Sequence, residues 1–379
     1  MNKASFAFAA LGALAGAASA QSNVTLYGVF DTAARHTSNV NAKGEALTGL
    51  GSGLIQGSRW GVRGVEDLGG NLKAIFDLQS GFNPGTGASA QQGQLFSRQA
   101  WVGLEGGFGK VTLGRQFGIG FDQFGAFDPY GIGNASQIAA MQYDLFGARF
   151  DNTIKYAKKF GPVGFSAAHS EGGVAGNATA GATNGVGLDY ADGALSLNSA
   201  YQVSADIAER KSSAIVLGGT YTVGAAKLYA GYARNKRDRG FASCANNNAS
   251  SLGATVPAAC VGGANPNGIN GPLSNTNLAP GSASGDGKTD LYLIGAQYNL
   301  TPEWQVVGAY MENKTAIAGS PDARHRAAYA VLDYYFSKRT DVYASIDRHV
   351  ARGYVGAYDS SANGNRATTG LMLGLRHRF

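Results

Sequence analysis

Hydrophobic and polar residues alternate along much of the chain, in segments of roughly ten residues. In NLKAIFDLQSGF, the positions from Leu72 to Leu78 that share one face are apolar, whereas Lys73, Asp77 and Gln79 occupy the other face. The segments 227–235 (KLYAGYARN) and 341–349 (DVYASIDRH) repeat this alternation. A period of two is typical of β-strands with one buried face, so the pattern predicts a protein built of strands.

The connections between these segments alternate in length. Short turns lie near residues 66–70, 106–110, 160–164, 191–194, 223–226, 300–304 and 337–341. Longer loops lie near residues 36–51, 83–94, 119–148, 170–184, 204–210, 236–288, 314–324 and 352–366. Seven turns alternating with eight loops predict 16 antiparallel strands with both chain ends on one side. Short turns at one rim and long loops at the other are typical of a bacterial transmembrane β-barrel, which leaves no strand edge unpaired in lipid. A soluble array of β-sandwiches would not show this alternation.

The first 20 residues have the features of a secretory signal peptide. Lys3 precedes an apolar run from about Ala4 to Ala18, and small residues at 18–20 predict cleavage before Gln21. We expect residues 21–379 to form one exported barrel domain. After Gln21 no apolar run approaches the ~18 to 20 residues that a membrane-spanning helix needs.

The composition agrees with an exported β-protein. The chain has 57 glycines, 9 prolines and 10% aromatic residues, and its mean hydropathy is −0.12. It is therefore too polar for a helical membrane protein and too aromatic for a disordered one. Cys244 and Cys260 lie in a stretch rich in Gly, Asn and Pro, where they either form a disulfide across the loop or remain free thiols.

Several segments resemble a known family. They are NVTLYGVFD (23–31), SRWGVRGVEDLGGNLKAIFDLQSGFN (58–83), LFSRQAWVGLEGGFGKVTLGRQFG (95–118) and the closing GLRHRF (374–379). In these segments the chain is similar to the general-diffusion porins of Gram-negative bacteria, of the β-proteobacterial type. The resemblance implies an outer-membrane barrel of 16 strands, a homotrimer, and a third external loop that folds inward and narrows the pore.

The third long loop carries the acidic candidates of the pore. Asp122, Asp128 and Asp144 lie among its glycines and aromatic residues. The resemblance implies that acids of this loop face the pore. The Pro-Glu-Phe-Gly type of stretch found in the family is absent, and FGAFDPYG (124–131) stands near its place. We expect Asp122 and Asp128 to face the pore and Asp144 to lie at the base of the loop.

Basic candidates for the opposite wall lie on the neighbouring strands. If Trp60 and Val62 face outward, alternation turns Arg59 and Arg63 into the lumen. The resemblance adds Arg98 and Arg149 to this wall; Arg115 fits the motif, although alternation does not decide its face. A permanently charged, rigid guanidinium is suited to such a wall. The alternative is that these arginines only neutralise wall carboxylates such as Asp77.

The alternation continues to the C-terminal residue and predicts a last strand with one outward and one inward face. Leu371, Leu373, Leu375, His377 and Phe379 alternate outward, while Met372, Gly374, Arg376 and Arg378 point to the lumen or rim. The terminal aromatic resembles the signal by which the barrel assembly machinery recognises outer-membrane proteins. Outer-membrane lipid and lipopolysaccharide are the further partners expected.

Charge and motifs narrow the function. The formal net charge is +6, and loss of Lys3 with the signal peptide leaves about +5, so we expect weak anion preference for small hydrophilic solutes and ions. The chain contains neither G-x-S-x-G nor His-Glu-x-x-His, and its five histidines form no triad along the sequence. We therefore expect no enzyme activity, cofactor, metal or nucleic-acid partner. A substrate-specific channel and a barrel without conductance are the alternatives.

Overall fold

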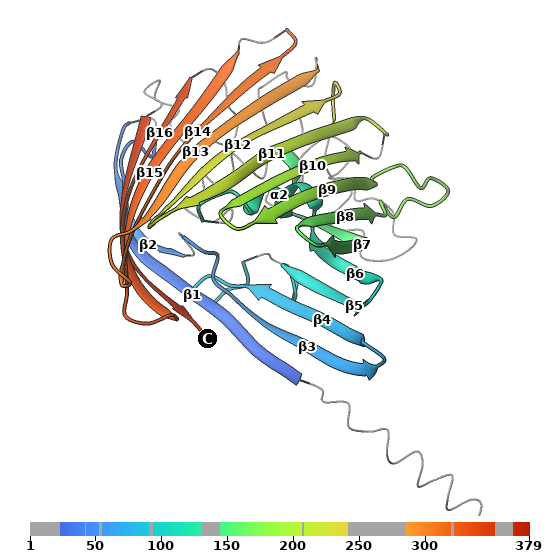
Figure 1. The fold of residues 1–379 in the computed structure, drawn as a ribbon. Coiled ribbons are helices and arrows are strands. Elements are labelled where there is room, and N and C mark those ends of the chain that lie inside the picture. The colour runs from blue at the N-terminus through green and yellow to red at the C-terminus, as the bar shows by residue number, and fades with distance from the viewer. Residues whose placement is uncertain are drawn as a thin grey trace, which may run out of the picture.

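The alternating segments form antiparallel strands that pair into one closed sheet in a computed structural model. The structure describes residues 23–41, 43–52, 55–90, 94–130, 145–206, 208–241, 286–319, 322–352 and 367–379. Its strands are β1 (Asn23–Thr37), β2 (Leu47–Ser52), β3 (Arg59–Gly69), β4 (Leu72–Gly81), β5 (Gln99–Gly106), β6 (Gly109–Phe117), β7 (Arg149–Phe160), β8 (Val163–Ser170), β9 (Thr183–Asp192), β10 (Leu195–Ala205), β11 (Lys211–Val223), β12 (Ala226–Arg237), β13 (Gly287–Asn299), β14 (Trp304–Ile317), β15 (Ala323–Tyr335), β16 (Thr340–Arg352) and β17 (Ala367–Arg378). Among the described residues, the helix α2 (Ile119–Gly125) lies inside the barrel (Figure 1).

The prediction of a 16-stranded barrel is confirmed, with β2 as an additional strand. The barrel closes where β1 pairs with β17 over Val29–Thr37 and with β3 over Asn23–Val29. Because β3 begins at Arg59, opposite Val29, the upper half of β1 would keep an open edge. The extra strand β2 pairs with residues 32–37 of β1 and covers that edge.

The C-terminal residue continues the pairing of the last strand. The backbone N–H of Gly28 donates to the Phe379 carbonyl oxygen at 3.0 Å, and the Phe379 N–H donates to the Gly28 oxygen at 3.1 Å. The Phe379 ring covers Gly28, where a Cβ would overlap it. Leu373 is 67% exposed and Met372 only 4%, so the outward and inward alternation predicted for this strand is confirmed.

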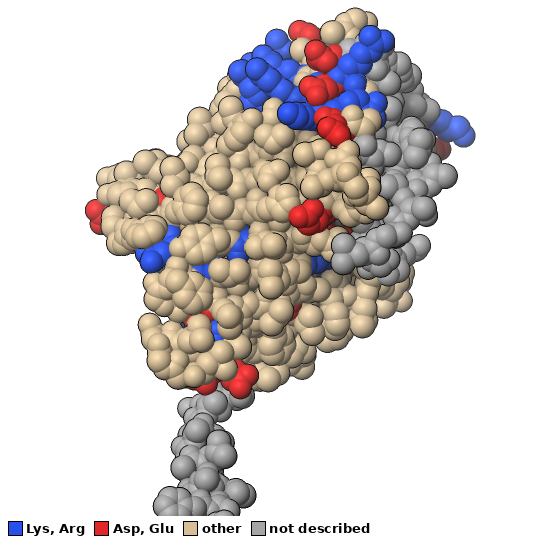
Figure 2. Space-filling view, turned by 90° about the vertical axis from the view of Figure 1, so that its right-hand side faces the viewer, with Lys and Arg blue, Asp and Glu red and all other residues tan. Residues whose placement is uncertain are grey.

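The outer surface is an apolar band between two charged or aromatic ends. Strand positions such as Leu113, Ile294 and Leu373 are exposed there, as suits a wall in contact with lipid. Figure 2 shows few charged side chains on this band and a gathering of them at the top of the molecule. At the end with the short turns, the Trp304 and Tyr334 rings lie 4.7 Å apart, which places aromatic side chains at the membrane interface. No helix among the described residues is long and apolar enough to cross a membrane.

Candidate functional site

The described parts of the third loop, residues 119–130 and 145–148, lie inside the barrel against a track of glycines on the inner wall. A side chain at any of these positions would collide with the loop: a Cβ at Gly187 would lie 2.9 Å from Ile119, and one at Gly218 2.6 Å from the Phe127 ring. Phe124 and Phe127 are fully buried by this packing, and their ring centroids lie 4.8 Å apart. The glycines that receive the loop are Gly185 and Gly187 on β9, Gly218 on β11, Gly231 on β12 and Gly295 on β13. The predicted inward fold of this loop is therefore confirmed.

Amide side chains of the wall hold the backbone of the loop. Gln202 on β10 accepts a hydrogen bond from the Gly120 N–H at 3.1 Å and donates to the Phe146 carbonyl at 2.5 Å. Asn235 on β12 donates to the Leu145 carbonyl at 2.6 Å. Hydrogen bonds to both ends of the loop satisfy backbone groups that would otherwise be buried without partners, so the loop is fixed rather than merely packed.

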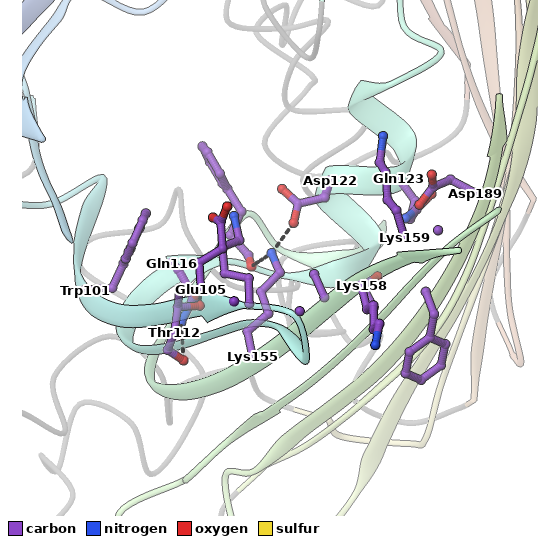
Figure 3. A pocket seen from close by; sticks show the side chains of 18 of the residues that line it. Trp101, Glu105, Thr112, Gln116, Asp122, Gln123, Lys155, Lys158, Lys159 and Asp189 are labelled. Atoms are coloured by element: carbon purple, nitrogen blue, oxygen red, sulfur yellow. Dashed lines mark hydrogen bonds and ion pairs between the residues drawn. The ribbon is translucent and has the colours of Figure 1, made fainter. Parts of the chain in front are cut away.

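The loop places Asp122 beside a lumenal cavity of about 690 Å³ between α2 and strands β5–β9. Asp122 forms an ion pair with Lys155 of β7, and the two side chains point toward one another across the cavity (Figure 3). Lys155 also donates to the Phe117 carbonyl at 3.2 Å. The carboxylate of α2 is thus partly neutralised by the wall beneath it.

Asp128 occupies a different environment from Asp122. Its side chain is only 5% exposed, and it accepts a hydrogen bond from the Tyr130 N–H at 3.3 Å. Tyr130 follows it along the loop and lies 6.0 Å from the Tyr329 ring of β15. Asp128 is therefore enclosed where the loop reaches the far wall. Asp144 lies outside the described residues, as do Cys244 and Cys260.

Arg59 and Arg63 lie on the inner face of β3, on either side of a tyrosine from β1. The Tyr27 ring covers Gly61 between them, and the Arg63 guanidinium lies 5.1 Å from the ring centroid. Arg59 donates to the Gly57 carbonyl at 2.9 Å. Within the part of the chain that the structure describes, neither arginine forms an ion pair.

A hydrogen-bonded chain holds Asp77, which pairs directly with Arg63 across β3 and β4 but forms no ion pair with it among the described residues. The Tyr27 hydroxyl donates to Asp77 Oδ1 at 2.5 Å. Gln79 Nε2 donates to the Tyr27 oxygen at 2.8 Å, and Arg98 Nε donates to Gln79 Oε1 at 2.7 Å. The carboxylate is therefore held by a neutral donor, and Arg98 is joined to the same wall.

Arg115 and Arg149 lie at the base of the third loop. Arg115 sits where the pairing of β6 with β7 is irregular; it forms an ion pair with Asp151 and donates to the Ser97 carbonyl at 2.7 Å. Arg149 is 3% exposed and lies 4.5 Å from the centroid of the Phe117 ring. These contacts join the strands that enter and leave the loop.

A second charged cluster on the inner wall was not predicted as a site. Arg376 forms ion pairs with Asp333 at 3.3 Å and Asp341 at 2.9 Å, all three being buried. Nearby, Asp31 accepts hydrogen bonds from the Tyr343 hydroxyl at 2.6 Å and the Ile55 N–H at 3.0 Å. Alternation along the last strand predicted that Arg376 points inward, but the sequence did not indicate its partners on β15 and β16. Among the described residues, no group of three or more His, Cys, Asp or Glu side chains could hold a metal ion.

A closed transmembrane barrel with a charged loop inside its lumen defines a class of channel proteins. A family model described as Gram-negative porin matches residues 7–354. The chain is 30% identical to an outer membrane porin of Bordetella pertussis and 30% identical to outer membrane porin protein 32 of Delftia acidovorans, over the full length of both chains in each case. The chain belongs to the Gram-negative porin family and forms a diffusion channel in the bacterial outer membrane. An anion-selective porin from Comamonas acidovorans shares its fold, with a TM-score of 0.69 and 24% identity over 95% of this chain and 100% of that one.

Proposed function

We propose that the constriction between the third loop and the arginine wall makes this channel a general-diffusion pore with weak anion preference. The observation that supports the sign is the difference in pairing between the two sides. Asp122 is paired with Lys155, whereas Arg59 and Arg63 have no ion pair among the described residues. Fixed charges at a wet constriction set ion preference without closing the pore. A wall with unpaired arginines therefore favours anions.

The expected preference is small because the lumen contains water. A unit charge about 7 Å from a passing ion contributes roughly 0.6 kcal/mol in water. Screening over a Debye length of about 8–10 Å reduces this by roughly half. Since the same charge attracts an anion and repels a cation, one unpaired arginine changes the anion-to-cation permeability ratio by roughly two- to threefold.

The proposal includes the export and assembly of the protein. The barrel would be exported with residues 1–20 removed, inserted with Phe379 as the residue recognised by the assembly machinery, and associated as a homotrimer. The porin from Comamonas acidovorans is described as anion-selective; for this chain the proposal depends on its own charges. Of the two acids expected at the constriction, Asp122 and Asp128, only Asp122 is proposed to face the pore, because Asp128 is buried.

Purified protein in a planar bilayer tests the proposal. We expect stepwise currents that grow linearly with salt concentration, and liposome swelling rates that fall smoothly with solute size. A current that saturates, or that one sugar or amino acid blocks, would instead indicate a substrate-specific channel. A barrel without conductance would contradict both.

A further inference from the structure

Two histidines face one another on the inner wall, near the ends of β15 and β16 that carry the long loops. In the pairing of these strands, His325 lies opposite Ala351. His349 lies opposite Ala327, two residues further along the same face, so the two histidines are diagonal neighbours. His325 is 2% exposed and His349 3%. The chain has only five histidines, and the channel function uses neither of these two.

The two imidazole rings direct one nitrogen each at the other ring. His349 Nδ1 lies 3.3 Å from His325 Nε2, with the ring centroids 5.5 Å apart and the ring planes tilted by 40°. Two nitrogens bound to one tetrahedral Zn²⁺ at about 2.0–2.1 Å lie roughly 3.3–3.4 Å apart. The pair therefore has the separation of two ligands of one metal ion. It is also longer than the about 2.7–3.2 Å of usual N–H···O hydrogen bonds.

A carboxylate orients one ring of the pair from behind. Asp347 Oδ1 lies 3.3 Å from Nε2 of His349, the nitrogen that faces away from His325. An acceptor at this position favours the tautomer with its proton on Nε2, which turns the lone pair of Nδ1 toward His325. Metal-bound histidines usually have such an acceptor at their second nitrogen.

The carboxylate is itself fixed by an arginine from the first strand. Arg35 of β1 donates to both oxygens of Asp347, at 2.7 and 2.8 Å. β17 lies between these strands, and its Gly370 leaves room for the contact, because a Cβ there would lie 2.2 Å from Arg35 Nη2. Arg35 balances the charge of Asp347, so the carboxylate needs no charged histidine as its partner. Residues of β1, β16 and β17 thus hold one imidazole in place.

We propose that His325 and His349 bind one divalent transition metal ion, Zn²⁺ or Cu²⁺, on the inner wall of the barrel. Imidazole nitrogens suit both ions, whereas Mg²⁺ and Ca²⁺ require oxygen ligands. The site is open, because two protein ligands leave the other positions to water or an anion. It is smaller than the groups of three or more His, Cys, Asp or Glu that are absent from the described residues. A bound ion links β15 to β16 and adds positive charge to the inner wall.

The test counts metal ions bound to the full-length folded protein. Because both imidazoles are almost fully buried, Zn²⁺ is supplied during refolding and the excess is removed by gel filtration. The site variant is His325→Gln, His349→Gln. The matched control, His36→Gln, His169→Gln, removes two histidines that make hydrogen bonds at exposed positions. Gel mobility before heating shows that each barrel is folded, and elemental mass spectrometry gives the metal content.

We expect one Zn²⁺ per chain in wild type and control, and none in the site variant. Loss of both ligands should weaken binding by more than the about 10- to 100-fold that a metal site loses with an outer partner of a ligand. Binding should also disappear at acidic pH, since an imidazole must be neutral to ligate a metal. In Cu²⁺-loaded wild type, electron paramagnetic resonance should show coupling to two nitrogens, and in the single variant His349→Gln to one.

Four results would overturn the proposal. Wild type without retained Zn²⁺ would show that the histidines form a hydrogen-bonded pair only. Equal Zn²⁺ content in site variant and control would place the metal elsewhere. Equal retention of Ca²⁺ or Mg²⁺ would indicate oxygen ligands, and coupling of Cu²⁺ to fewer than two nitrogens in wild type would exclude the paired ligation. The metal count does not depend on conductance, so a failure of the channel proposal would not alter it.

Discussion

Replacing Gly218 by alanine tests whether the glycine track holds the third loop in the lumen. A Cβ at this position would lie 2.6 Å from three carbons of the Phe127 ring, whereas carbon atoms pack best at about 3.5–4.0 Å. The ring must therefore move by about 1 Å. Gly218 is paired with Asn198 on one side and Gly231 on the other, so the wall is held by its ladder and the loop must give way.

Overpacking of this kind destabilises a packed arrangement by about 1–3 kcal/mol. If the docked state of the loop is destabilised by that free energy, the population of channels with an undocked loop rises roughly 5- to 150-fold. We expect single-channel recordings of Gly218→Ala to show larger and more variable conductance steps, with the barrel still folded by its gel mobility before heating. Gly308→Ala is the matched control, because its Cβ would meet only the Tyr329 carbonyl oxygen, at 3.5 Å. If both variants conduct like wild type, the loop is not held by the glycine track and the reasoning fails.

Three further variants test separate contacts. Tyr27→Phe removes the hydroxyl that donates to Asp77, so the carboxylate turns to Arg63. The anion-to-cation permeability ratio should then fall roughly two- to threefold. The control Tyr232→Phe loses a comparable hydrogen bond to Asp290 on the outer wall and should leave the ratio unchanged. Asp122→Asn leaves Lys155 without its carboxylate and should raise the same ratio, measured as a zero-current potential; a fall would contradict the proposed sign. Deleting Phe379 removes two hydrogen bonds to Gly28 and should lower the yield of folded barrel, while the conductance of the folded fraction stays normal; a normal yield on refolding and in cells would refute its assembly role.

The sequence predicted the barrel well because alternation and loop length are local signals. The outward positions of Leu371, Leu373 and Phe379 could be read from a period of two, and so could the number of barrel strands. The additional strand β2 was missed because LTGLGS is rich in glycine and pairs only because β3 starts late.

The site was harder to predict, since it depends on contacts between distant segments. Nothing in the sequence around Gly218 or Gly231 indicates that Phe127 will cover them. Alternation could not place Arg115 because the strand pairing shifts beside Gly114, whose φ is +128°. Alternation places Lys155 inward, because it follows the outward Ile154, but no sequence pattern indicates that its partner is Asp122 of the loop.

The most direct test of the central claim is the zero-current potential of the channel in a planar bilayer under a KCl gradient. It should be measured for wild type and for the double variant Arg59→Gln, Arg63→Gln. We predict a potential of the sign for anion preference in wild type and a clear shift toward cation preference in the double variant, at similar conductance. A cation-selective wild type, or a double variant with the wild-type potential, would contradict the assignment of the arginine wall as the element that selects ions.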